Sequence, residues 1–98
     1  MQLDPTRVAE IQKTRPCLVV TSDIVNARRR TVVVVPLFTG PRVSPPLLIG
    51  VPSAGAAAVA VLDQLRAVAK ERLLERLGTV TPHELTAVEE GLRDILEL

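Results

Sequence analysis

The chain has 98 residues, 47% of them hydrophobic, and a formal net charge of +1. This length suits a single domain over residues 1–98 and is too short for two. The only aromatic residue is Phe38, which excludes the nucleic-acid binders that stack successive bases on several aromatic side chains. The single cysteine, Cys17, excludes an internal disulfide, and we expect it to fill the core.

The basic and acidic side chains are unevenly distributed along the chain. Basic residues dominate residues 7–42, whereas acidic residues dominate residues 82–98. A surface that faces a polyanion explains this asymmetry, and an ordinary solvated surface is the alternative. No apolar stretch reaches the roughly 20 residues of a membrane span, and the N-terminus lacks the basic-then-apolar layout of a signal peptide. We therefore expect a protein of the reducing cytoplasm with no membrane partner.

The first segment, residues 3–20, is an extended lead-in that continues into a polar loop over residues 7–14. Arg15 and Pro16 then open an apolar, β-branched run, which predicts a strand over residues 17–22. A guanidinium held beside a carboxylate at the end of a strand is suited to binding phosphate. The polar side chains that gather just before this strand are Glu10, Gln12, Lys13 and Arg15.

The middle of the chain contains the clearest strand, residues 31–37, where five consecutive β-branched residues indicate the centre of a sheet. A polar connector over residues 22–30 precedes it. Pro36 is predicted to end its hydrogen-bond ladder. A loop punctuated by proline and glycine follows over residues 39–46, and residues 47–51 are predicted to form another strand.

The next segments have weaker signals. Residues 53–58 are small and loop-like. Residues 59–68 suit either a helix or a strand by period, and their β-branched valines favour a strand. We expect a single helical turn over residues 70–74 and a last short strand over residues 77–80.

The C-terminal segment predicts an amphipathic helix. Thr81, Pro82 and Glu84 have the spacing of an N-cap, a first-turn proline and a capping-box acid. Several short strands followed by one helix predict an α+β, β-rich fold, a small barrel on which the helix lies. The apolar residues that recur at helical spacing are Leu85, Val88, Leu92, Ile95 and Leu96.

Three blocks of the sequence occur in a specific order and at specific separations. They are LDPTRVAEIQKTRPCLVV followed by SDIVN, TVVVVPLFT at residues 31–39, and residues 59–96 with Gln64 and Arg66 at characteristic places. Together they resemble the PemK/MazF family of toxins from type II toxin–antitoxin systems. The resemblance implies a homodimer of SH3-like or CcdB-like barrels, a cognate antitoxin, and no cofactor.

The resemblance also implies an activity, the metal-independent and sequence-selective cleavage of single-stranded RNA such as mRNA. In this reaction the 2′-hydroxyl attacks the adjacent phosphate and leaves a 2′,3′-cyclic phosphate and a 5′-hydroxyl. The sequence itself has no Gly-rich phosphate loop and no cluster of His, Cys, Asp and Glu with metal-ligand spacing. The alternatives are a non-catalytic toxin on the same fold, of the gyrase-inhibiting CcdB kind, and an inactive homologue.

Three residues are candidates for the catalytic positions of the family. Arg15 matches its active-site arginine, which implies electrostatic stabilisation and proton donation, with a structural pairing to Glu10 as the alternative. Glu10 matches an acidic residue of the substrate loop, either a base toward the 2′-hydroxyl or, as we favour, a group that orients Arg15. Thr39 lies beside the position of a catalytic hydroxyl, but ungapped counting puts Phe38 there. Since side chains alternate along a strand, Thr39 serves only if Pro36 or a bulge resets the register.

Further residues are expected to bind RNA. Gln12 and Lys13 match a loop that grips RNA in the family. Gln64 matches a glutamine beside the groove, and the core of a strand pair is its competing place. We expect the connector arginines to contact phosphates, with an ordinary exposed charge run as the alternative; they are Arg28, Arg29 and Arg30. His83 is not expected to be catalytic, because its neighbours are a helix cap and an exposed face.

The N-terminus departs from the family pattern. Family members have a strand before the pair that matches Asp4 and Pro5, and the first part of that strand is absent here. The resemblance therefore implies either a late start codon or a sheet that lacks an edge segment. In the second case we expect a neighbouring strand to expose its backbone.

Overall fold

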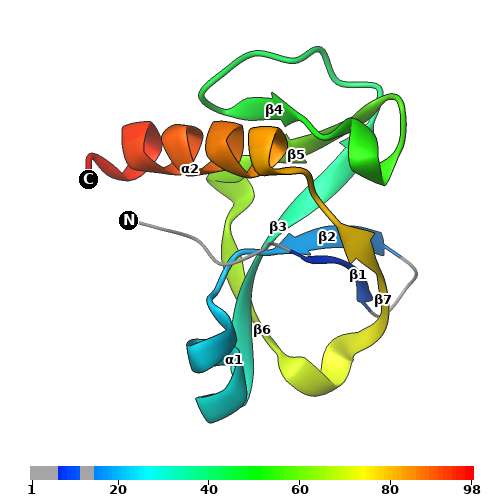
Figure 1. Ribbon diagram of the computed structural model, residues 1–98, viewed down its shortest axis with the longest axis vertical. Helices are drawn as coiled ribbons and strands as arrows, with labels where there is room; N and C mark the ends of the chain where they lie inside the picture. Colours follow the sequence, from blue (N-terminus) through cyan, green and yellow to red (C-terminus); the bar gives the residue numbers. More distant parts are fainter. Residues whose placement is uncertain (1–6, 12–14) are drawn as a thin grey trace.

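The computed structural model describes residues 7–11 and 15–98. Within these residues seven strands pair antiparallel and curl into a barrel-like sheet, and one long helix lies across it (Figure 1). The strands are β1 (Arg7–Ile11), β2 (Arg15–Val19), β3 (Thr31–Thr39), β4 (Leu48–Gly50), β5 (Ala58–Val61), β6 (Arg66–Ala69) and β7 (Leu73–Thr79). The α-helices are α1 (Asp23–Arg28) and α2 (Pro82–Leu96), and the short 3₁₀ helices are η1 (Pro52–Ala54), η2 (Leu62–Gln64) and η3 (Lys70–Arg72). The predicted β-rich α+β fold with a C-terminal helix is confirmed.

The central strand β3 changes partner along one of its edges. Its first four residues pair with β6 and its last three with β5, while β2 pairs with its middle on the other edge. Pro36 lies in the interval between β6 and β5. The N–H of Val20 donates to the carbonyl of Val33, and alternation from that pair directs the nitrogen of Pro36 away from β2 and into the interval. The prediction that Pro36 ends the ladder holds for the pairing with β2, whose last pair is Cys17 with Pro36, but β3 itself continues to Thr39 with β5 as its partner.

The two faces of β3 contribute to two hydrophobic clusters. Val35 and Leu37 belong to the larger cluster, into which α2 inserts Val88. Val34 belongs to a smaller cluster around the buried Cys17. α2 therefore covers one face of the sheet, and the other face forms the inside of the curl (Figure 1).

The start of α2 has the predicted capping box. The hydroxyl of Thr81 accepts from the N–H of Glu84 at 3.2 Å, and the Glu84 carboxylate accepts from the N–H of Thr81 at 2.7 Å. Glu84 is only 5% exposed and also accepts from the N–H of Ser53 at 2.8 Å and from the Ser53 hydroxyl. Burial raises the pKa of the Glu84 carboxyl, but the hydrogen bonds from Ser53 and Thr81 outweigh it and leave the pKa below its ordinary value. The helix is thereby tied to η1.

Residues 7–11, predicted as part of a polar loop, form β1 instead. This strand lies between β2 and β7 and buries the side chains of Val8 and Ala9. Its ladder to β7 has two register shifts. By occupying this place, β1 supplies hydrogen-bond partners to both neighbouring strands, whose backbone groups would otherwise face solvent.

Residues 23–28, predicted as a polar connector, form the helix α1. Ser22 caps it by accepting from the N–H of Val25 at 3.3 Å. Its six residues are too few to show a helical period in the sequence. Among the described residues no helix is long and apolar enough to cross a membrane.

The other predicted elements are present with shifted boundaries. The strand expected over residues 17–22 is β2, which begins at Arg15, and the strand expected over residues 47–51 is β4. Residues 59–68 form two strands, β5 and β6, with η2 as a corner between them. η3 supplies the predicted helical turn, and β7 begins at Leu73, earlier than expected.

Candidate active site

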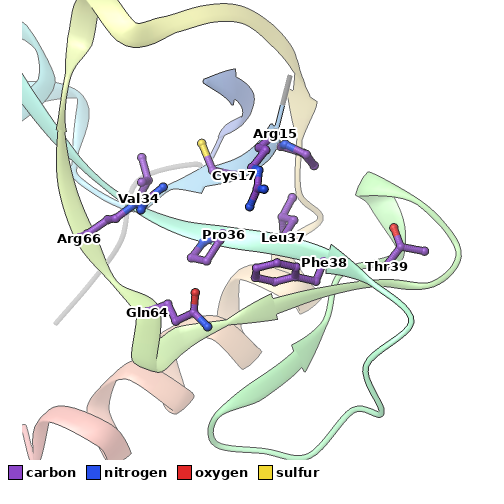
Figure 2. Close-up of a pocket in the computed structure, with 10 residues that line it drawn as sticks. Arg15, Cys17, Val34, Pro36, Leu37, Phe38, Thr39, Gln64 and Arg66 are labelled. Atoms are coloured by element: carbon purple, nitrogen blue, oxygen red, sulfur yellow. The ribbon is translucent and has the colours of Figure 1, made fainter. Parts of the chain in front are cut away.

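A pocket of about 380 Å³ opens where the start of β2, the end of β3 and the corner between β5 and β6 meet (Figure 2). Cys17 and Pro36 are part of its wall. It brings together two guanidinium groups, an amide and the only aromatic ring of the chain. The residues that supply these groups, together with one hydroxyl, are Arg15, Phe38, Thr39, Gln64 and Arg66.

The strand register explains why these distant residues meet. Cys17 pairs with Pro36 across β2 and β3. Arg15 lies two residues before Cys17 and Phe38 two residues after Pro36, so both point to the same face as that pair. On the other edge of β3, Val34 pairs with Arg66. The inner face of the sheet therefore carries Arg15 on one side of β3 and Arg66 on the other.

Thr39 lies at the rim of the pocket. No register shift occurs where β3 pairs with β2 or with β5, where Phe38 is opposite Val59 and Thr39 opposite Ala58. Thr39 could face Arg15 only if the strand register shifted by one residue, and these pairings show no such shift. Figure 2 shows Thr39 apart from the ring of Phe38 and from Gln64.

Arg15 and Arg66 are both exposed at the pocket. Among the side chains that the structure describes, no carboxylate forms an ion pair with either guanidinium. Two positive charges without a counter-ion among these described side chains favour an anionic ligand in the space between them. A phosphate group meets that need, and the planar guanidinium can bind two of its oxygens at once.

Cys17 lies in the wall of this pocket but is not suited to nucleophilic catalysis. Its side chain is buried, and burial raises the pKa of the thiol to about 11, with the nearby charge of Arg66 acting in the opposite direction. The thiol is therefore protonated at neutral pH, and only the thiolate is a strong nucleophile. The expectation that Cys17 is a core residue is confirmed.

Gln64 is exposed at the end of η2 and borders the pocket. This exposed position excludes the alternative prediction for Gln64, a place in the core of a strand pair. His83 is exposed in the first turn of α2 and does not border the pocket. Among the described residues no group of three or more His, Cys, Asp and Glu is arranged to hold a metal ion.

The connector arginines lie at the opposite end of β3. Arg28 is the last residue of α1, and Arg29 and Arg30 border a separate surface hollow with Lys70. At a rise of about 3.3 Å per residue, the start of β3 is roughly 23 Å from Phe38. The structure therefore does not bring the connector arginines into the pocket.

The remaining candidates precede β2. Glu10 lies in β1 opposite Pro16, next to the pocket residue Arg15, but its side chain is outside the described part of the structure. Gln12 and Lys13 lie outside the described residues altogether. The role of all three remains a prediction.

Phe38 and Arg66 are pocket residues that the sequence did not mark as functional. For Phe38 a signal was present, since ungapped counting from Arg15 puts it in the position of the expected hydroxyl. For Arg66 the signal lies in the pairing of β3 with β6, which joins Val34 to Arg66 across more than 30 residues of sequence. Such a register is not visible in a single sequence.

Comparison with known proteins identifies the family of this chain. The family model of the PemK-like, MazF-like toxin of type II toxin–antitoxin systems matches residues 1–96. Endoribonuclease MazF9 of Mycobacterium tuberculosis (strain H37Rv) is 34% identical, over 100% of this chain and 91% of that protein.

Solved structures resemble the fold over most of its length. An endoribonuclease from a mycobacterial species has a TM-score of 0.83 at 27% identity. The match covers 94% of this chain and 88% of the endoribonuclease. A mycobacterial endoribonuclease in complex with its cognate antitoxin has a TM-score of 0.78 at 26% identity, over 100% of this chain and 97% of its own. The chain therefore belongs to the PemK/MazF family of toxins from type II toxin–antitoxin systems.

Proposed function

We propose that this chain is the endoribonuclease toxin of a toxin–antitoxin pair and that it cleaves single-stranded RNA in the pocket between Arg15 and Arg66. The observation that carries the proposal is the exposed Arg15 guanidinium, which has no described counter-ion and faces a hollow of about 380 Å³. Membership of the PemK/MazF family makes RNA the polyanion that this hollow receives.

The proposed reaction is an internal transesterification. The 2′-hydroxyl oxygen attacks the adjacent phosphorus, the bond from phosphorus to the 5′ oxygen breaks, and a 2′,3′-cyclic phosphate forms. The 2′-hydroxyl loses its proton and the departing 5′ oxygen gains one. Negative charge grows on the phosphate oxygens in the transition state, and a guanidinium that donates two hydrogen bonds stabilises that charge.

Arg15 has the central role in this proposal. Its guanidinium stabilises the phosphorus centre and donates hydrogen bonds toward the leaving oxygen. Glu10 orients Arg15, Arg66 supplies a second positive charge across the pocket, and Thr39 contributes from the rim. Thr39 has the smaller part, because its side chain leaves β3 on the face opposite to Arg15.

The RNA extends beyond the pocket in this proposal. Gln12, Lys13 and Gln64 contact the strand near the cleaved bond. The connector arginines, Arg28 to Arg30, contact phosphates at the far end of β3, where they add affinity without choosing a sequence. We further propose that the toxin acts as a homodimer in the cytoplasm and that its cognate antitoxin covers these basic surfaces.

One experiment tests the activity. The protein, an Arg15→Ala variant and an Arg72→Ala control are incubated with a long single-stranded RNA in EDTA, and the 5′ ends of the products are mapped. Arg72 is an exposed arginine of η3 outside the pocket. We expect discrete cuts with 5′-hydroxyl ends from the wild type and the control, and far weaker cleavage from Arg15→Ala. Intact RNA after incubation with the wild type contradicts the proposal.

A further inference from the structure

The most unusual side chain of the pocket is Phe38. It is 37% exposed, whereas its β3 neighbours Leu37 and Val35 are 5% and 0% exposed. A single exposed apolar side chain is ordinary on a protein surface. Phe38, however, is the only aromatic residue of the chain. The buried core is aliphatic, and Phe38 lines the pocket instead of filling that core.

The groups around the ring are those that a nucleotide requires. Gln64 and Phe38 line the same pocket, and Figure 2 shows both side chains below β3 in this view, with Arg15 above it. An amide side chain offers both a donor and an acceptor to the edge of a base. A guanidinium neutralises the phosphate that flanks the base, and an aromatic face stacks on it.

The register places these two side chains on one face. Arg15 lies two residues before Cys17 and Phe38 two residues after Pro36, just beyond the last pair of β2 with β3, so both point to the face of that pair and both line the pocket. A base on the ring of Phe38 therefore has its own phosphate within reach of Arg15. The pocket volume of about 380 Å³ falls within the range of small-ligand sites, roughly 300–1,000 Å³.

We propose that Phe38 is a stacking platform for one unpaired base of the RNA and that Gln64 reads the edge of the same base. The proposal rests on the function proposed above and adds its specificity-determining residue. A base within a duplex is already stacked and paired, so this subsite selects single strands. Where the family resemblance predicts a hydroxyl, this chain holds a ring.

Binding to an uncleavable RNA tests the platform independently of catalysis. The probe is a short, mixed-sequence single strand with 2′-O-methyl groups throughout, which lack the attacking hydroxyl. We expect Phe38→Leu to weaken binding roughly 5-fold to 100-fold, because leucine keeps the apolar character but has no ring to stack. Phe38→Tyr keeps the ring and should bind as the wild type does. Leu77→Ala removes an exposed apolar side chain of β7 outside the pocket and serves as the control.

A coupling measurement locates the stacked base. The base is removed from one position of the probe at a time, leaving the sugar and phosphate. With wild-type protein, one position should show a large loss of affinity, and with Phe38→Leu that loss should disappear because the platform is already gone. Gln64→Glu should change which base is preferred at that same position. Thermal unfolding of each variant verifies that it is folded.

The outcomes separate this inference from the proposed function. Cleavage of ordinary RNA by the wild type, with Phe38→Leu equal to it in binding and in base preference, overturns the stacking platform and leaves the endoribonuclease. Binding that depends on Phe38, with ordinary RNA left intact, supports the platform and overturns the endoribonuclease. Failure of the wild type to bind the probe overturns the platform.

Discussion

Arg15 and Phe38 lie on the same face of adjacent strands, in the register that pairs Cys17 with Pro36. Both border one pocket, and neither side chain belongs to a hydrophobic cluster of the core. The residue after Phe38 has the hydroxyl, but strand alternation turns Thr39 toward the opposite face. The ring of Phe38 and the hydroxyl of Thr39 therefore lie on opposite faces of β3, and substitutions can test the contribution of each one separately.

Arg15→Ala should lower the single-turnover rate of RNA cleavage by roughly 10² to 10³, the loss that follows when one donor to a developing oxyanion is removed. Arg15→Lys should fall between the wild type and Arg15→Ala, since an ammonium keeps the charge and loses the two-pronged geometry. Rates are measured with protein in excess over RNA. Equal rates for Arg15→Ala and the Arg72→Ala control would exclude Arg15 from the reaction.

Thr39→Ala should leave the cleavage rate close to that of the wild type. The hydroxyl lies at the rim, and the uninterrupted pairing of β3 with β5 directs the side chain away from Arg15. Single-turnover cleavage of the same RNA measures the effect, with Thr86→Ala, on an exposed part of α2, as the matched control. A drop as large as that of Arg15→Ala would show that the hydroxyl reaches the phosphate despite the register.

The elements that the sequence predicted well are those specified by local chemistry. The capping box of Thr81 and Glu84 and the β-branched run of β3 are determined by neighbouring residues, and both are present as expected. β1 was missed because its five residues lie in a mixed polar segment and take a strand conformation between β2 and β7, whose flanking is not visible in the sequence. α1 was missed because six residues carry too little periodic signal.

The candidate site was predicted in part for a similar reason. Arg15 could be selected from its motif, whereas the approach of Gln64 and Arg66 depends on a corner at η2 and on pairing between β3 and β6. Pro36 was expected to end the hydrogen-bond ladder of this strand, and the change of partner from β6 to β5 was not visible in the sequence. The continuation of β3 past Pro36 is what carries Phe38 into the pocket.

Glu84→Gln should destabilise the fold by about 1–3 kcal/mol at neutral pH, because it weakens charge-assisted hydrogen bonds from Ser53 and Thr81 to a buried carboxylate. The pKa of this carboxyl is lower in the folded protein than its ordinary value of 4.5. Its contribution is therefore complete above that value and is lost as the pH falls through the lower, folded-state pKa.

Urea unfolding at a series of pH values measures this linkage. The stability difference between wild type and Glu84→Gln should be constant at neutral pH and shrink in acid. Glu90→Gln, which changes an exposed carboxylate of the same helix, serves as the matched control. A difference between wild type and Glu84→Gln that is independent of pH would contradict a contribution from the charged carboxylate.

Gly91→Ala should destabilise the protein although alanine favours a helix by about 1 kcal/mol. A Cβ at Gly91 would lie 2.5 Å from Cδ1 of Leu62 and 2.9 Å from the carbonyl oxygen of Pro46. The backbone oxygen cannot turn away as a side chain can, so α2 must move off η2 and the loop before β4, at a cost of about 1–3 kcal/mol. Thermal and urea unfolding measure the change. Gly78→Ala makes the same substitution where no atom lies within 4 Å, and a Gly91→Ala variant as stable as Gly78→Ala would contradict the close packing of α2.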